Sequence, residues 1–148
     1  VYISMAFGNP YNEKWSVEIV SLWVQKLTEI GVNEVALSDT VGVADETDIE
    51  TLFLSLKKKF PSINLSAHFH ALPGKWETKV NTAYKAGCKH FDGAVNGFGG
   101  CPMATDDLTG NMATENVLSF LANNQIQSGI DQNAFLESMQ LAGRTFPQ

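Results

Sequence analysis

The sequence predicts an α/β fold in which parallel strands alternate with helices. Four apolar runs rich in β-branched and aromatic residues begin about 30 residues apart, which is the spacing of repeated βα units. The segments between these runs carry apolar residues at three- and four-residue intervals, the pattern of amphipathic helices. Because strands joined by helices of this length pair in parallel through right-handed crossovers, we expect one parallel sheet covered by helices.

Each element follows from its own local pattern. The β-rich runs place the strands at residues 1–7, 34–38, 63–69 and 89–95. The helical pattern places helices at residues 16–31, 46–60 and 75–87, and a helical tail of two further helices at 114–124 and 131–143. We expect Ser16 to cap the first helix, with Glu18 in its first turn. Gly31 and Gly87 are expected to close the first and third helices, and Thr114 to cap the fourth.

Four βα units fit either an open, doubly wound sheet or part of a barrel. A complete (β/α)8 barrel takes about 250 residues, so this 148-residue chain would hold roughly half of one. The chain begins at Val1 within an apolar run that is already typical of a strand. We therefore expect residues 1–148 to form a single partial domain, with the upstream half and any targeting segment outside this sequence.

The composition argues against several classes of protein. A formal net charge of −6, from 10 basic and 16 acidic residues, does not fit a nucleic-acid partner, which requires a basic surface. No apolar stretch approaches the roughly 20 residues that cross a bilayer, so we expect no membrane partner. Cys88 and Cys101 lack the spacing of a disulfide framework, which favours a reducing compartment. We expect the cytoplasm, or the mitochondrial matrix in a eukaryote.

The segment SAHFHALPG, residues 66–74, contains two of the three histidines. Residues i and i+2 of a strand face the same way, so His68 and His70 are expected on one face at the carboxyl end of the third strand. In parallel sheets that end is where ligands and catalytic groups gather. A divalent metal shared by both rings would satisfy them, and two hydrogen-bonded histidines at a strand end are the alternative.

The segment NGFGGCPMATDDLTGNMATEN, residues 96–116, follows the fourth strand and holds a second group of candidates. Gly99 and Gly100 let the backbone approach a ligand closely and hold Cys101 at the same edge as the histidines. The Cys101 thiol could move a proton if a nearby cation lowered its pKa, or it could be a small turn residue. Asn111 could complete a coordination shell through its side-chain oxygen, or organise the turn. The segment lacks the glycine spacing of a dinucleotide-binding loop, which argues against a nucleotide-dependent dehydrogenase.

Polar residues at the ends of the second and fourth strands complete the candidates. Asp39 and Thr40 terminate the second strand within LSDTVGVAD. Asp39 could orient a metal-bound histidine or touch substrate, and it could equally hydrogen-bond to its own loop. Asp92 is interpreted as a structural hydrogen-bonding residue, and Cys88 as a small core residue. His90 has no neighbouring ligand in the sequence, and the three tryptophans fit helix packing.

Three motifs together resemble one known family. The sequence reads SDTVGVA after one strand, HFH at the next, and VNGFGGCPMA followed by TGNMATENVL after the one beyond. These motifs resemble the carboxyl-terminal half of hydroxymethylglutaryl-CoA lyase, a metal-dependent (β/α)8 enzyme that breaks a carbon–carbon bond next to a carbonyl. The resemblance covers nearly all of the chain, from the GNPY turn at residues 8–11 onward, and the glycine-rich cysteine loop is its most specific part.

The resemblance implies a fold, a cofactor and roles for individual residues. The fold would be the carboxyl-terminal half of a (β/α)8 TIM barrel with a helical tail. Mg²⁺ or Mn²⁺ would be held by His68, His70 and Asn111. Cys101 would be the loop thiol that helps to move protons during cleavage, and Asp39 is the second catalytic candidate. The residues expected to contact an acyl-CoA substrate are Thr40, Asn96, Gly99 and Gly100.

The family's first barrel strand carries an Asp metal ligand and an adjacent Arg, and no segment of this sequence corresponds to that strand. We therefore expect this chain alone to bind metal weakly and to show little or no turnover. Joined to its upstream half, it would cleave 3-hydroxy-3-methylglutaryl-CoA to acetoacetate and acetyl-CoA. The sequence also departs from the family after the histidines, where it reads Ala71, Leu72, Pro73 and Gly74 in place of an Asp or Asn with a nearby Gly.

Two other functions fit parts of the sequence. Isopropylmalate and homocitrate synthases share the His-x-His strand and a similar loop, but they lack the GGCP sequence that is present here. A non-catalytic half-barrel that serves in assembly is the second alternative. Exposed edge strands would lead such a chain to form a homo-oligomer, as a dimer, or to pair with the missing half.

Overall fold

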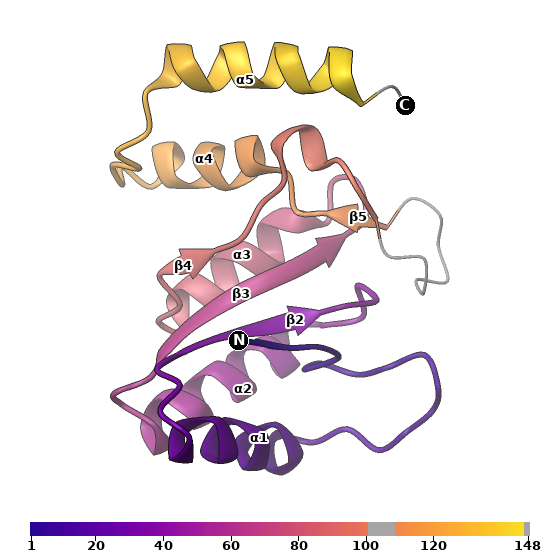
Figure 1. Ribbon diagram of the computed structural model, residues 1–148, viewed down its shortest axis with the longest axis vertical. Helices are drawn as coiled ribbons and strands as arrows, with labels where there is room; N and C mark the ends of the chain where they lie inside the picture. Colours follow the sequence, from indigo (N-terminus) through magenta and orange to yellow (C-terminus); the bar gives the residue numbers. More distant parts are fainter. Residues whose placement is uncertain (101–108, 147–148) are drawn as a thin grey trace.

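The fold is organised around a parallel sheet whose strands lie side by side in chain order, in a computed structural model that describes residues 1–100 and 109–146 (Figure 1). The strands of this path are β1 (Tyr2–Ile3), β2 (Glu34–Asp39), β3 (Asn64–Ala71) and β4 (His90–Phe91). Every neighbouring pair along it is parallel, which confirms the predicted α/β class. A doubly wound sheet reverses its strand order part-way, whereas this order runs in one direction, as it does around a barrel.

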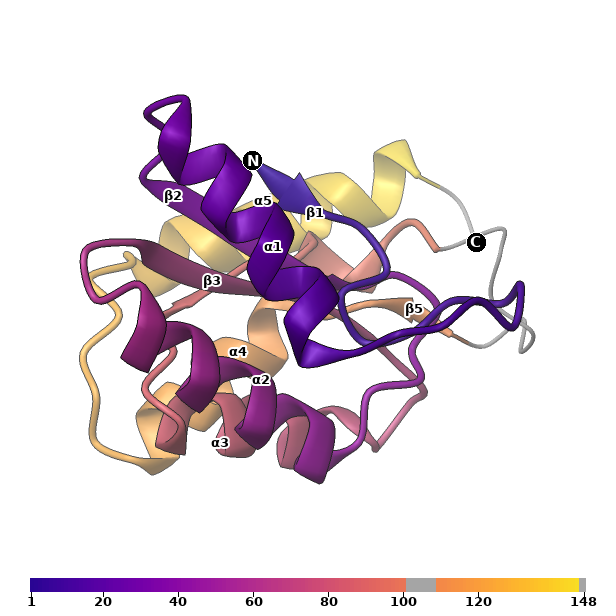
Figure 2. The same cartoon turned by 90° about the horizontal axis from the view of Figure 1, so that it is seen from below.

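The five predicted helices are all present. They are α1 (Val17–Glu29), α2 (Glu46–Lys59), α3 (Trp76–Lys85), α4 (Thr114–Asn123) and α5 (Gln132–Thr145). Each of α1 to α4 contacts the next one along the chain, so that they form an outer layer beside the strands (Figure 2). The last helix, α5, contacts the 3-10 turn η1 at Val95–Gly97. No helix within the described residues is long and apolar enough to span a membrane.

The alternation of side chains along β3 determines which residues face the helices. Ala67 and Phe69 are 1% and 2% exposed and belong to the hydrophobic core. His68 and His70 alternate with them and therefore project from the opposite face of the sheet. In β2 the register pairs Asp39 with Phe69, so the side chain of Asp39 lies on the helix side.

The central strands match their predicted positions, but the outer strands are much shorter than predicted. After β1 the chain leaves the sheet at Met5, which adopts a left-handed φ of 57°. After β4 the chain turns at Gly93, where a Cβ atom would lie 2.8 Å from the Thr114 hydroxyl oxygen. A fifth strand, β5 (Gly110–Asn111), was not predicted and pairs antiparallel with the end of β3. Two residues of alternating pattern are too few to be recognised as a strand from sequence.

Most of the predicted helix ends are confirmed. The Ser16 side chain accepts a hydrogen bond from the Ile19 backbone N–H, and Gly31 and Gly87 have φ values of 89° and 94°. The predicted cap at Thr114 is wrong, because Ala113 occupies the N-cap position and no side chain caps α4. Thr114 is already helical and its backbone N–H donates to the Ala94 carbonyl.

Cys88 is a buried thiol, 1% exposed, whose sulfur donates to the His90 carbonyl oxygen at 3.1 Å. Burial raises the pKa of this thiol from 9.0 to about 11. The thiol therefore ionises at a lower pH in the unfolded chain than in the folded one. As the pH rises from 9 to 11, the free energy of unfolding falls by on the order of 2 kcal/mol.

We expect the free energy of unfolding of Cys88→Ala to fall less than that of the wild type between pH 9 and pH 11, measured by urea unfolding under reducing conditions. Parallel stability curves for the two proteins would contradict this assignment.

Candidate active site

The carboxyl end of β3 brings two histidines together. The ring centroids of His68 and His70 are 5.3 Å apart with an interplanar angle of 76°, so the rings meet edge to face. This placement agrees with the expectation that both side chains share one face of the strand. His70 is buried and His68 is about one-third exposed.

Asn111 lies directly opposite His70, because β5 pairs with the end of β3 in this register. The Asn111 amide nitrogen donates to the Phe98 carbonyl at 2.9 Å, which leaves its side-chain oxygen as the atom suited to a cation. Gly99 is required beside it, since a Cβ atom there would lie 2.8 Å from the Asn111 amide nitrogen. The φ of Gly99, 84°, is also one that other residues rarely adopt. The three predicted metal ligands therefore converge at one edge of the sheet.

The hydrogen on the His70 ring can be assigned from its partner. Nδ1 of His70 lies 3.1 Å from the backbone carbonyl oxygen of Asp39, and a carbonyl oxygen can only accept. Nδ1 therefore carries the hydrogen and Nε2 keeps a lone pair. Burial lowers the pKa of His70 below its usual value, although the bond to the Asp39 carbonyl acts in the opposite direction. The ring is consequently neutral near pH 7, the form that binds a metal.

Asp92 and Tyr2 lie beside His68 on the same face. The Oδ2 atom of Asp92 is 3.3 Å from Nδ1 of His68, and this buried oxygen makes no hydrogen bond within the described residues. A hydrogen bond to Asp92 raises the pKa of the Tyr2 phenol, and the ring of Tyr2 packs edge-on against His68. An Asp92 oxygen in need of a donor is the partner expected for a metal-bound imidazole, whose Nδ1 carries a hydrogen. Asp92 was predicted to be a structural hydrogen-bonding residue, whereas its Oδ2 atom lies beside the His68 ring of the candidate site.

These residues fit part of a coordination shell for a divalent cation. A hollow of about 490 Å³ is lined by Tyr2, His68, Asp92 and Asn111, among others. Within the described residues, no group of three or more His, Cys, Asp or Glu side chains is arranged to hold a metal ion. The candidate ligands in these parts of the chain are therefore two imidazoles and one amide oxygen, a donor set that suits a cation but does not complete its coordination.

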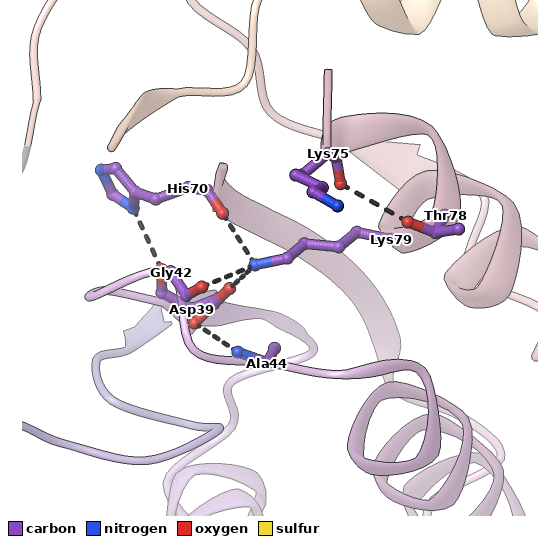
Figure 3. A network of polar contacts seen from close by, with 7 residues as sticks. All are labelled: Asp39, Gly42, Ala44, His70, Lys75, Thr78 and Lys79. Carbon is purple, nitrogen blue, oxygen red and sulfur yellow. Dashed lines mark hydrogen bonds and ion pairs between the residues drawn. The ribbon is translucent and has the colours of Figure 1, made fainter. Parts of the chain in front are cut away.

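Asp39, a catalytic candidate, shares the helix side of the sheet with Phe69, opposite the histidine rings. Its carboxylate lies against the Lys79 ammonium (Figure 3). Asp39 is 1% exposed, its Oδ1 accepts from the Ala44 backbone N–H at 3.1 Å, and its Oδ2 is 2.5 Å from the Lys79 ammonium. The carboxylate therefore binds its own loop and a helix. Asp39 reaches the site through its backbone carbonyl, which holds His70. Of the two functional roles considered for Asp39, the geometry supports orientation of His70 and does not support contact with a substrate.

The other candidates are placed as follows. The Thr40 hydroxyl accepts from the Met5 backbone N–H at 2.8 Å. The Asn96 side chain donates to the Met139 carbonyl at 3.0 Å, so it binds α5. Gly100 forms an isolated bridge with Gly110, next to Asn111. Cys101 lies outside the described residues. Of the predicted substrate contacts, only Gly99 and Gly100 lie beside the ligand set.

Lys79 is the residue of this region that sequence reasoning missed. Its ammonium donates to Asp39, to the Gly42 carbonyl at 3.0 Å and to the His70 carbonyl at 3.0 Å (Figure 3). A signal was present, because Lys79 stands in the apolar stripe of α3 between Trp76 and Val80. A lysine in such a stripe indicates a buried acidic partner.

Comparisons with known proteins identify the family of this chain. The chain matches the family model described as HMGL-like over residues 2–141, which is nearly its whole length. The chain belongs to the HMGL-like family. Within it, hydroxymethylglutaryl-CoA lyase of Bacillus subtilis is 34% identical over 137 residues, covering 93% of this chain and 46% of that protein.

Solved structures of this family place the HMGL-like chain in a known architecture. The hydroxymethylglutaryl-CoA lyase structure from Pseudomonas aeruginosa matches with a TM-score of 0.90 and 31% identity, over 99% of this chain and 49% of that one. The HMG-CoA lyase from Acinetobacter baumannii, in complex with coenzyme A and 3-methylmalate, matches with a TM-score of 0.84 and 28% identity, over 97% and 47%. The chain spans about half the length of the relatives it matches. The expected half of a (β/α)8 barrel is confirmed.

The ion pair between Lys79 and Asp39 makes a prediction about stability. Lys79→Met would leave a buried carboxylate without its cation, and we expect a loss of about 3–5 kcal/mol in the free energy of unfolding. The double variant Asp39→Asn with Lys79→Met should recover most of this loss, since no charge is then buried. The exposed Lys75 of the same region provides the control, and Lys75→Met should change stability by less than about 0.5 kcal/mol. Equal stability of Lys79→Met and the wild type, measured by urea unfolding, would refute the prediction.

Proposed function

We propose that this chain is part of a metal-dependent carbon–carbon lyase that cleaves 3-hydroxy-3-methylglutaryl-CoA to acetoacetate and acetyl-CoA. The observation that carries the proposal is the convergence of His68, His70 and Asn111 at the carboxyl edge of the sheet, in a chain of the HMGL-like family. The names of its relatives support the acyl-CoA substrate, since they include lyases that act on this compound and one solved with coenzyme A.

In this proposal the cation is Mg²⁺ or Mn²⁺, and His68, His70 and Asn111 hold it. Such a cation would supply stabilisation of the negative charge that develops on substrate oxygens. The polar partners of the two rings orient them for this role, because the Asp39 carbonyl fixes His70 and the Asp92 carboxylate lies beside His68.

Cleavage requires two proton movements. Loss of the tertiary hydroxyl proton allows the carbon–carbon bond to break, and the electron pair of that bond passes to the thioester fragment. That fragment then takes up a proton and becomes acetyl-CoA, while the other fragment is acetoacetate. We propose that Cys101, which directly follows Gly99 and Gly100 in the sequence, moves a proton during cleavage.

We further propose that the complete site needs a complementary half of the barrel. Within residues 1–100 and 109–146, β1 and β4 each have one partner in the sheet path, so both edges can accept further strands. Beyond the β1 edge, the outer face of α1 exposes Ile19, Leu22 and Trp23, the last of which was predicted to fit helix packing. These apolar side chains and open edges are suited to the neighbouring βα units of a closed barrel.

The metal site can be tested on this chain without any reaction. We expect Mn²⁺, followed by electron paramagnetic resonance, to bind the wild type weakly and the His68→Ala and His70→Ala variants at least about tenfold more weakly. His90→Ala is the matched control. His90 lies on the same face of the sheet as His68, opposite Ser66 of β3, and is not one of the proposed ligands. Unaltered Mn²⁺ affinity in both ligand variants would exclude these rings as ligands.

The activity can be tested on the chain joined to its natural upstream sequence. We expect the joined protein to release acetoacetate from 3-hydroxy-3-methylglutaryl-CoA, and the chain alone to show little or no turnover. Cys101→Ser in the joined protein should lower kcat by about 100-fold or more, the usual size of a lost proton-transfer group. Cys88→Ser serves as the control, since this buried thiol contacts the Leu65 and His90 carbonyls and none of the proposed ligands. A joined protein that binds Mn²⁺ and leaves the substrate intact would overturn the lyase proposal.

A further inference from the structure

We propose that Lys79 is a positioning residue that fixes the tautomer and orientation of His70, with Nδ1–H bound to the Asp39 carbonyl and Nε2 free for a ligand. The inference rests on the proposed function in one respect, which is that Nε2 of His70 binds the cation. The orientation itself is a property of the metal-free chain.

The Lys79 ammonium connects the ends of two strands. Lys79 is 8% exposed, and its three hydrogens match three oxygen acceptors: the Asp39 carboxylate, the Gly42 carbonyl and the His70 carbonyl (Figure 3). Asp39 ends β2, Gly42 lies in the loop that follows, and His70 lies near the end of β3. A compact ammonium with three donors suits acceptors that come from three directions.

The ladder between β2 and β3 ends at His70. Its last register pair is Asp39 with Phe69, the residue that precedes His70. On its other side His70 pairs with Asn111, in the short strand β5. The contact between the His70 ring and the Asp39 carbonyl therefore lies at the end of this ladder. Lys79 holds both partners of that contact, because it binds the side chain of Asp39 and the backbone carbonyl of His70.

This bridge determines which ring nitrogen carries the hydrogen. In a neutral imidazole the tautomer is set by the hydrogen bond that one nitrogen makes. If the Asp39 carbonyl moves away from Nδ1, the ring loses the acceptor that favours Nδ1–H, and Nε2 becomes protonated in part of the molecules. A protonated Nε2 cannot bind a metal. Lys79 thus acts on the candidate metal site from the helix side of the sheet, without contacting the hollow.

The test uses the metal-free chain labelled with ¹⁵N, at a pH where the rings are neutral. Long-range ¹H–¹⁵N spectra distinguish the two tautomers of each imidazole, and His70 is identified with His70→Gln. We expect the wild type and the control Lys75→Met to show His70 with hydrogen on Nδ1 only. Lys79→Met should show both tautomers, and His90 should be unchanged. If Lys79→Met does not fold, the charge-neutral double variant Asp39→Asn with Lys79→Met is measured instead, and it too should show both tautomers.

Mn²⁺ affinity separates the two proposals. If Lys79 positions His70 for a cation, Lys79→Met or the double variant should bind Mn²⁺ at least about tenfold more weakly than Lys75→Met. A single Nδ1–H tautomer in the folded Lys79 variants, with Mn²⁺ affinity unchanged, would overturn the inference and leave the metal site standing. If His68→Ala and His70→Ala bind Mn²⁺ with the same affinity as the wild type, the proposed metal site is overturned. The tautomer of His70 in the Lys79 variants would still decide the role of Lys79.

Discussion

The strict alternation of side chains along β3, locked by its pairing with β2, is the constraint on which the rest of this structure depends. Ala67 and Phe69 enter the core beneath the helices, so His68 and His70 have only the opposite face available to them. A shift of one residue in register would bury the histidines and expose the core side chains. The hydrophobic effect thus acts indirectly on the site, because the burial of apolar neighbours determines where the imidazoles point.

A second level of organisation is polar and lies at the strand ends. The parallel ladder of β2 and β3 ends at Asp39 and His70, and the Lys79 ammonium adds a polar connection there by binding the Asp39 carboxylate and the His70 carbonyl. A buried ion pair is a poor source of net stability, since the cost of removing two charges from water offsets most of their attraction. Its value here lies in geometry, because it adds a fixed polar contact between the two strand ends where the β2–β3 ladder finishes.

Much of the architecture could be predicted from sequence, because its signals are local. The strands β2 and β3, five helices and the caps at Ser16, Gly31 and Gly87 follow from patterns within a few residues of each other. The face shared by His68 and His70 follows from a spacing of two. The strand β5 could not be predicted in this way, because a two-residue strand has no pattern of its own and exists only through its pairing with β3. The face of Asp39 and its pairing with Lys79 were missed for a similar reason, since these residues are 40 positions apart in sequence.

The open face of the sheet has a chemical character that bears on how the chain meets other molecules. Tyr2, Ser66, His68, His90 and Asp92 line its hollows. Groups of this kind lose well-formed contacts with water when they are covered, and they regain them only from a surface that offers a complementary donor or acceptor at each point. Covering this face would therefore favour a surface that offers complementary donors and acceptors over a purely apolar one.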